Sequence, residues 1–258
     1  MKKFTKFFIG LFNFSLIRNN TLEALQSRQT QSERRADIEF TLAFGGKFGD
    51  RLFELLSKSR SQFKQDLFVI SEVDFKSNGY FVEFGATDGI TFSNTYLLEK
   101  EFGFNGILAE PNPNMRKNIA KVRDVFIETE CVWSKSGEII DFVDSGGKST
   151  ISRFLHADMH AGKRRSNNIF KIKTISLTDM LEKYGAPNLI DYLSIDTEGS
   201  EFEILQAHDF NKFKFKIITV EHNYSNQRQK IYDLLTSYGY KRKYEFISGV
   251  DDWYILDN

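Results

Sequence analysis

Residues 82–89 read VEFGATDG, a short apolar segment that runs into two glycines and an acid. Continuous apolar residues are typical of a strand that is buried on both faces of a parallel sheet. Gly85 and Gly89 allow the backbone to turn sharply after such a strand and to approach a ligand closely. The stretch therefore predicts a strand of a nucleotide-binding α/β sheet, although an ordinary strand-to-helix turn would also account for the two glycines.

Further apolar runs follow this stretch and alternate with segments of helical period. The alternation predicts an α/β domain with a mostly parallel central sheet. Residues 240–246 and 252–256 are joined too closely for a crossover helix, so they should form an antiparallel pair at one edge. The other expected strands lie within NGILAE (105–110), DVFIETECVW (124–133), LIDYLSID (189–196) and FKIITVEHN (215–223).

The residues before the first strand predict helices. We expect an N-terminal helical extension over residues 1–59, interrupted by a loop at the glycines of residues 45–49, and a main domain over residues 60–258. A polar insertion near residues 144–169 suits a lid over the acceptor. Its basic run, residues 163–165, is either a solvated surface or a grip on an anionic acceptor.

Composition restricts the class of protein. The chain of 258 residues is 41% apolar and can bury a sizeable core. Lys and Arg number 35, as do Asp and Glu, so no global positive field would attract nucleic acid, and we expect no nucleic-acid partner. The single cysteine, Cys131, excludes an intramolecular disulfide and fits a cytoplasmic location, although a secreted protein without disulfides would look the same.

Residues 7–17 form a phenylalanine-rich apolar run behind Lys2, Lys3 and Lys6. The run is too short to span a bilayer as a helix, and no clear cleavage site of a secretion signal follows it. We expect a helix that packs on the main domain or on a second subunit, which would form a homodimer. The alternative is shallow attachment to an anionic membrane surface through the aromatic and basic side chains.

The residues after each predicted strand should line one crevice, because ligands bind at the carboxyl ends of strands in an open parallel sheet. Glu110 follows Gly85 by 25 residues, near the spacing at which nucleotide-binding folds place the acid that binds ribose hydroxyls. The dinucleotide fingerprint GxGxxG is absent. Asp88 would repel a pyrophosphate, whereas Glu83 and Asp88 suit a cationic amino group, so charge favours S-adenosylmethionine over NAD.

Five segments resemble the FkbM family of S-adenosylmethionine-dependent methyltransferases: VEFGATDG, SNTYLLE (93–99), GILAEPNP (106–113), LSIDTEGSEFEIL (193–205) and ITVEHN (218–223). The similarity covers roughly residues 60–256, and IDTEGSE is its most specific part, although family members usually carry valine in place of Thr197. The resemblance implies a Rossmann-like class I methyltransferase fold with a seven-stranded, mostly parallel sheet and one antiparallel edge strand. It also implies methyl transfer, most often to an oxygen of a sugar, polyketide or other small molecule.

The resemblance also implies cofactor-binding residues. Glu83, Gly85 and Gly89 would hold the methionine end, Glu110 would accept the ribose hydroxyls, and residues 131–133 would flank the adenine. Gln65 and Asp66 could fold over the cofactor. The full predicted set is Glu83, Gly85, Ala86, Asp88, Gly89, Ser93, Asn94, Thr95, Glu110, Pro111, Cys131, Val132 and Asp196.

Three residues are predicted to act on the acceptor. His222 is the candidate base because an imidazole titrates near neutral pH, although a histidine that only bonds a neighbouring loop would occupy the same place. Asp196 and Glu198 would position the acceptor, cap the following helix or, with Glu221, bind a divalent cation that acidifies the hydroxyl. Sites built from oxygen ligands have little sequence signature, so we assign no metal ligand.

The sequence therefore predicts a methyltransferase that uses S-adenosylmethionine to methylate a hydroxyl of a sugar, a glycan or another small molecule. Two other classes stay open. An NAD-dependent oxidoreductase that modifies sugars is disfavoured by the glycine spacing, and a non-catalytic Rossmann-like interaction module would keep the fold without the chemistry.

Overall fold

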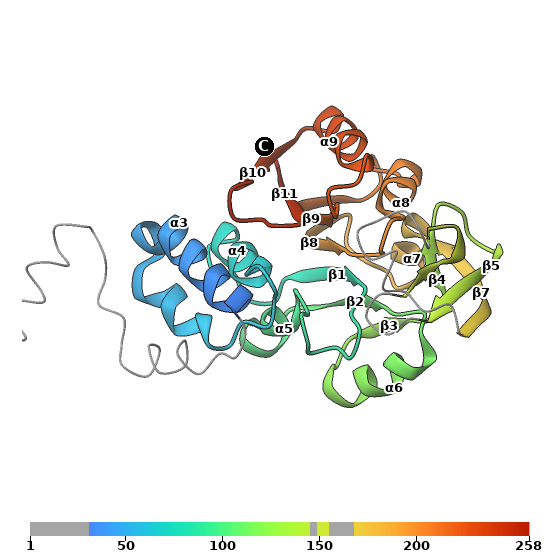
Figure 1. The fold of residues 1–258 in the computed structure, drawn as a ribbon, viewed down its shortest axis with the longest axis horizontal. Coiled ribbons are helices and arrows are strands. Elements are labelled where there is room, and N and C mark those ends of the chain that lie inside the picture. The colour runs from blue at the N-terminus through green and yellow to red at the C-terminus, as the bar shows by residue number, and fades with distance from the viewer. Residues whose placement is uncertain (1–30, 145–148, 155–167, 258) are drawn as a thin grey trace, which may run out of the picture.

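The structure, a computed structural model, describes residues 31–144, 149–154 and 168–257. Its centre is a seven-stranded sheet in the order β10-β11-β9-β8-β1-β2-β3 (Figure 1). The strands are β1 (Tyr80–Phe84), β2 (Asn105–Ala109), β3 (Phe126–Glu128), β8 (Leu189–Ile195), β9 (Lys214–Glu221), β10 (Tyr240–Lys243) and β11 (Asp251–Leu256).

The pairing of these strands confirms the predicted sheet. Strand β1 is parallel to β2 and β8, and the pairs β2–β3 and β8–β9 are also parallel. Strand β11 is antiparallel to both of its neighbours, β9 and β10. The reversed strand therefore lies one position in from the edge, and β10 is the edge strand itself.

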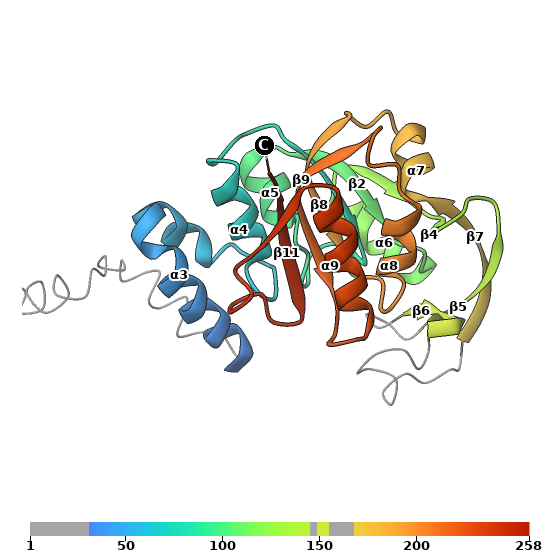
Figure 2. The same ribbon diagram turned by 90° about the horizontal axis from the view of Figure 1, so that it is seen from above.

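Helices cover both faces of the sheet. Successive side chains of a strand point to opposite faces, so each face presents apolar side chains that the helices bury. Val82 and Phe84 of β1 pack with α7 (Leu177–Lys183), α8 (Glu201–Ala207) and α9 (Gln227–Ser237). Phe81 faces the other side. There it packs with α4 (Gln65–Glu72), α5 (Tyr96–Phe102) and α6 (Pro113–Val122). Figure 2 shows α4 and α9 on opposite sides of the sheet.

A smaller sheet lies beside the carboxyl end of the main one. Its order is β4-β7-β5-β6, with β4 (Cys131–Trp133), β5 (Ile139–Asp144), β6 (Thr150–Ile151) and β7 (Asn168–Ser176). The prediction of one strand over residues 124–133 is wrong, because β3 and β4 belong to different sheets. The chain turns between them, where the buried Glu128 carboxylate accepts hydrogen bonds from the N–H groups of Thr129 and Glu130.

The predicted loop at residues 45–49 is also wrong, because α3 (Gln31–Leu56) runs through these glycines as one helix. Each glycine costs a helix about 1 kcal/mol relative to alanine. Burial outweighs that cost, since Phe40, Phe44, Leu52 and other side chains of α3 join the hydrophobic cluster around α4 and Phe81. The expected boundary between an extension and a main domain near residue 59 stays a prediction.

Two of the predicted features fall largely outside the described residues. These are the apolar run of residues 7–17 and, at residues 145–148 and 155–167, most of the predicted lid with its basic run. In the part of the chain that the structure describes, none of the helices combines the length and the hydropathy that crossing a bilayer requires.

Candidate functional site

A cavity opens where the carboxyl ends of β1, β2 and β8 meet the smaller sheet. The convergence follows from the parallel pairing, which brings the loops after these strands to one edge. Seven residues that the sequence predicts for the site line this cavity: Gly85, Glu110, Pro111, Cys131, Val132, Asp196 and Glu198. Thr87 and Thr197 also line it, in the segments after β1 and β8 that were expected to form one crevice. Phe142, Ser149, Ile151 and Ser200 line it as well but were not predicted.

Gly85 directly follows β1 and lies against the backbone of Asp196, which directly follows β8. Its φ is +75°, and a Cβ atom added to it would lie 2.3 Å from the carbonyl oxygen of Asp196. Neither the backbone conformation nor the space admits a side chain here. The glycine therefore brings the backbone of β1 to the cavity wall, as the sequence predicts.

Glu110 follows β2 and is buried, with 6% of its surface exposed. One carboxylate oxygen accepts a hydrogen bond from the N–H of Asn112 at 2.9 Å, and the other accepts one from the N–H of Thr87 at 3.1 Å. Burial raises the pKa of Glu110 to about 7 against the lowering effect of these two bonds. Each oxygen of a carboxylate has a second lone pair, so Glu110 can still accept hydroxyl donors from a ligand.

Cys131 and Val132 of β4 form an apolar part of the cavity, together with Phe142 and Ile151. Burial raises the pKa of the Cys131 thiol to about 12, so the side chain is neutral at physiological pH. Apolar side chains at this position can pack against a flat ring. Asn112 donates to Asp144 of β5 at 2.7 Å, which ties the smaller sheet to the end of β2.

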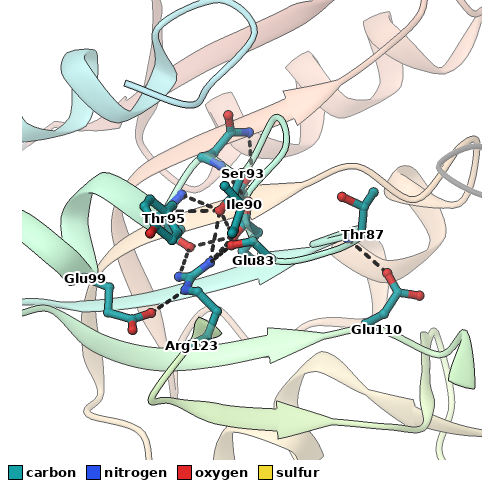
Figure 3. Close-up of polar contacts among 12 residues, drawn as sticks. Glu83, Thr87, Ile90, Ser93, Thr95, Glu99, Glu110 and Arg123 are labelled. Carbon is teal, nitrogen blue, oxygen red and sulfur yellow. Dashed lines mark hydrogen bonds and ion pairs between the residues drawn. The ribbon is translucent and has the colours of Figure 1, made fainter. Parts of the chain in front are cut away.

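Glu83 does not line the cavity, because its carboxylate is occupied by the loop that follows β1 (Figure 3). One oxygen accepts the N–H of Asn94 at 2.6 Å. The other accepts the hydroxyls of Ser93 at 2.9 Å and Thr95 at 2.5 Å. The structure thus places these four predicted cofactor residues together, in a buried network that fixes the loop.

Arg123 completes this network, and sequence reasoning missed it. Its side chain is fully buried and pairs with Glu99 and, at 3.8 Å, with Glu83. It also donates to the hydroxyl of Thr95 at 2.8 Å and to the carbonyl of Gly89 at 3.0 Å (Figure 3). A single arginine at the end of a polar helix has no pattern that distinguishes it from a surface residue.

Asp88 likewise stabilises the loop. It accepts hydrogen bonds from the N–H groups of Ile90 at 2.9 Å and Thr91 at 2.7 Å. Burial raises the pKa of Asp88, but these bonds outweigh that effect and hold it below its ordinary value. Asp88, Ala86 and Gly89 are not among the residues that line the cavity, so their direct contact with a cofactor stays a prediction.

Asp196, Glu198 and Glu221 meet at the ends of β8 and β9. Their ligand oxygens lie within 4.8 Å of one another, so these three residues could hold a divalent cation. Burial raises the pKa of Glu221, and the negative charges of Asp196 and Glu198 raise it further. Without a cation, carboxylates this close retain a proton, because they cannot all ionise.

Glu201, at the start of α8, holds the turn that presents these acids. Its carboxylate accepts the N–H groups of Thr197 and Gly199, each at 3.0 Å. Within the turn Glu198 has φ of +59°, a left-handed conformation that is uncommon for residues other than glycine. The most specific part of the sequence motif, IDTEGSE, therefore builds the acidic side of the cavity.

His222 is not among the described residues that line the cavity, so its role as the base at this site stays a prediction. It is 3% exposed, its Nδ1 accepts the N–H of Tyr224 at 3.0 Å, and its Nε2 lies 3.8 Å from Asp252. Side chains alternate along a strand end, so Glu221 faces Asp196 whereas His222 faces Asp252. The structure agrees with the alternative of a histidine that bonds a neighbouring loop.

Gln65 and Asp66 also lie away from the cavity lining. Gln65 is buried and donates to Asp251 of β11 at 2.7 Å, and Asp66 accepts the hydroxyl of Ser59 at 2.8 Å. Both residues connect α4 to its surroundings. Asp251 is paired with Glu221 in the register of β11 and β9, so Gln65 supports the acidic side of the site indirectly.

The family model described as the methyltransferase FkbM domain matches residues 83–242, a range that includes all the described residues that line the cavity. The chain belongs to the FkbM methyltransferase family. The predicted Rossmann-like class I methyltransferase fold is thereby confirmed together with the family. No protein of curated function matches the chain.

Among solved structures, methyltransferase FkbM from Methylobacillus flagellatus KT is similar, with TM-score 0.46, 9% identity, and coverage of 92% of this chain and 58% of that chain. Precorrin-6y C5,15-methyltransferase from Geobacter metallireducens GS-15 has TM-score 0.40 and 13% identity, over 69% of this chain and 71% of that chain. A SAM dependent methyltransferase from Archaeoglobus fulgidus has TM-score 0.36 and 14% identity, over 78% and 75%. The present FkbM chain spans less than two thirds of the first of these proteins.

Proposed function

We propose that this FkbM methyltransferase binds S-adenosylmethionine in the described cavity and transfers its methyl group to a hydroxyl of a neutral small molecule or glycan, such as a sugar. One observation supports the proposal most directly. The buried Glu110 carboxylate and the backbone at Gly85, from adjacent strands, line the same cavity, with lone pairs of Glu110 still available for ribose hydroxyls.

The charge of the cavity supports this cofactor over NAD. Glu110, Asp196 and Glu198 are acidic, and neither lysine nor arginine occurs among the described residues that line the cavity. A pyrophosphate would find no cation there, whereas the positively charged sulfonium is attracted by carboxylates. In this proposal Glu110 binds the ribose, Cys131 and Val132 flank the adenine, and Gly85 permits the close approach of the backbone.

The bound cofactor would supply a methyl group that is already activated. The protein then has to align the acceptor oxygen, exclude water and receive the hydroxyl proton as the new oxygen–carbon bond forms. We assign that last task to the cluster of Asp196, Glu198 and Glu221, either as a base or through a divalent cation that acidifies the hydroxyl. The same acids would repel an anionic acceptor at this position.

Titration calorimetry with S-adenosylhomocysteine tests the cofactor assignment. Glu110→Gln removes the buried charge that would accept hydrogen bonds from the two ribose hydroxyls. Each bond to a charged acceptor contributes about 1.5 kcal/mol or more, so the Kd of S-adenosylhomocysteine should rise roughly 100-fold. Asp141→Asn is the matched control, because Asp141 is an exposed acid of the neighbouring β5. It should leave the Kd unchanged.

The other two function classes give different results in this experiment. Binding of NAD without binding of S-adenosylhomocysteine would favour an oxidoreductase. Binding of neither ligand to the folded protein would favour an interaction module. Equal affinities of Glu110→Gln and the unchanged protein for S-adenosylhomocysteine would refute the role of Glu110.

A further inference from the structure

A groove of about 370 Å³ lies between the start of α3 and the loop that connects β10 to β11. Figure 2 shows the dark blue end of α3 close to that loop. Helix α3 contributes Arg35 and Ala36, and the loop contributes Phe246 and Val250. The groove is separate from the cavity described above, since the two share no lining residue.

Two aromatic side chains at this groove are exposed. Phe246 is 73% exposed and Tyr224 is 65% exposed, and both line it. Isolated exposed apolar residues are ordinary, but two exposed aromatic side chains that line one groove indicate a surface that another apolar segment covers.

The sequence supplies such a segment directly before α3. Residues 7–17 read FFIGLFNFSLI, and residues 18–30 connect them to Gln31, where α3 begins. Arg35 is four residues further on, about one helical turn, so the connection joins the molecule beside the groove. The 13 connecting residues can extend to roughly 40 Å, which is ample for the chain to fold back.

The groove offers an anionic lipid surface no unpaired cation among the described residues that line it. Arg35 pairs with Glu39 at 2.8 Å, and Glu245, the other acid of the lining, pairs with Arg242 at 2.9 Å. The apolar run is flanked by the cationic residues Lys2, Lys3, Lys6 and Arg18. We propose that residues 7–17 bind in the groove between α3 and the β10–β11 loop of the same chain.

The groove also adjoins the end of β9. Val250, one of its lining residues, accepts the N–H groups of His222 at 2.9 Å and Asn223 at 3.3 Å. These two residues directly follow Glu221. A segment that binds in the groove would therefore stabilise the backbone next to the acidic side of the cavity.

Limited digestion of the full chain with trypsin tests the proposal through cleavage after Arg18. A bound segment is cleaved only after it leaves the groove, so Phe246→Ser should speed this cleavage by roughly tenfold. Phe126→Ser is the matched control, because Phe126 is another exposed phenylalanine, on β3 at the opposite edge of the sheet. It should leave the cleavage rate unchanged, and circular dichroism should show both variants folded.

Three results would overturn the proposal. Equal cleavage rates of the unchanged protein and Phe246→Ser would show that the segment does not use this groove. Protection that appears only as protein concentration rises, together with a dimer mass in light scattering, would identify a second copy as the occupant. Protection that requires vesicles of phosphatidylcholine and phosphatidylglycerol would identify a membrane surface instead.

Discussion

Replacing Gly85 with alanine tests the close approach of β1 and β8 on which the cavity depends. The added Cβ would lie 2.3 Å from the backbone oxygen of Asp196, and the φ of +75° is itself unfavourable for alanine. The conformation alone costs about 1 kcal/mol. The contact cannot be relieved by a side-chain rotation, because the oxygen belongs to the backbone, so we add about 1–3 kcal/mol for the forced displacement.

Gly137→Ala separates these two contributions. Gly137 has φ of +82°, and a Cβ atom there would meet nothing within 4 Å. In urea denaturation, Gly137→Ala should lower the free energy of unfolding by about 1 kcal/mol and Gly85→Ala by about 2–4 kcal/mol. Of the two variants, only Gly85→Ala should also weaken binding of S-adenosylhomocysteine, because it displaces Asp196. Equal losses of stability in the two variants would refute the close approach.

Three further predictions concern the site. Burial raises the pKa of Glu110 to about 7, and hydroxyl donors favour its ionised form, so affinity for S-adenosylhomocysteine should fall about fivefold between pH 7 and pH 6. Calorimetry of Glu110→Gln should show no such dependence on pH. Arg123→Met leaves the buried carboxylate of Glu83 without its cation and Glu99 with Lys100 alone, so urea denaturation should show a loss of about 3–5 kcal/mol. Exposed Lys135→Met should show almost none. Glu221→Gln should lower turnover roughly 100-fold but change the Kd of S-adenosylhomocysteine less than twofold. A chelator that stops turnover until Mg²⁺ is restored would assign Asp196, Glu198 and Glu221 to a cation site.

The sequence predicts the sheet well because its strands are buried on both faces. Continuous apolar runs such as the one before Gly85 are typical of such strands, and parallel pairing then forces the strand ends together. Glu110 and Asp196 could be placed at one cavity for this reason alone. Both lie directly after a strand, where the topology leaves little freedom.

Tertiary packing decides the features that the sequence could not predict. The glycines within α3 favour a loop locally, but burial of Phe40 and Phe44 keeps the helix continuous. The direction of the side chains at the end of β9 depends on the register with β11, which brings Glu221 rather than His222 to Asp196. Partners distant in sequence, such as Arg123 and Glu83, have no local pattern at all.

The central claim is methyl transfer from S-adenosylmethionine to a neutral hydroxyl, and one measurement tests it most directly. The full chain is incubated with S-adenosylmethionine that carries a deuterated methyl group and with extracts of neutral and anionic glycans, and the products are analysed by mass spectrometry. We predict that a neutral glycan or sugar gains one labelled methyl group on oxygen, and that Glu221→Gln greatly reduces the gain. Label found only on anionic acceptors or on nitrogen, or no label with any extract while S-adenosylhomocysteine binds, would contradict this claim.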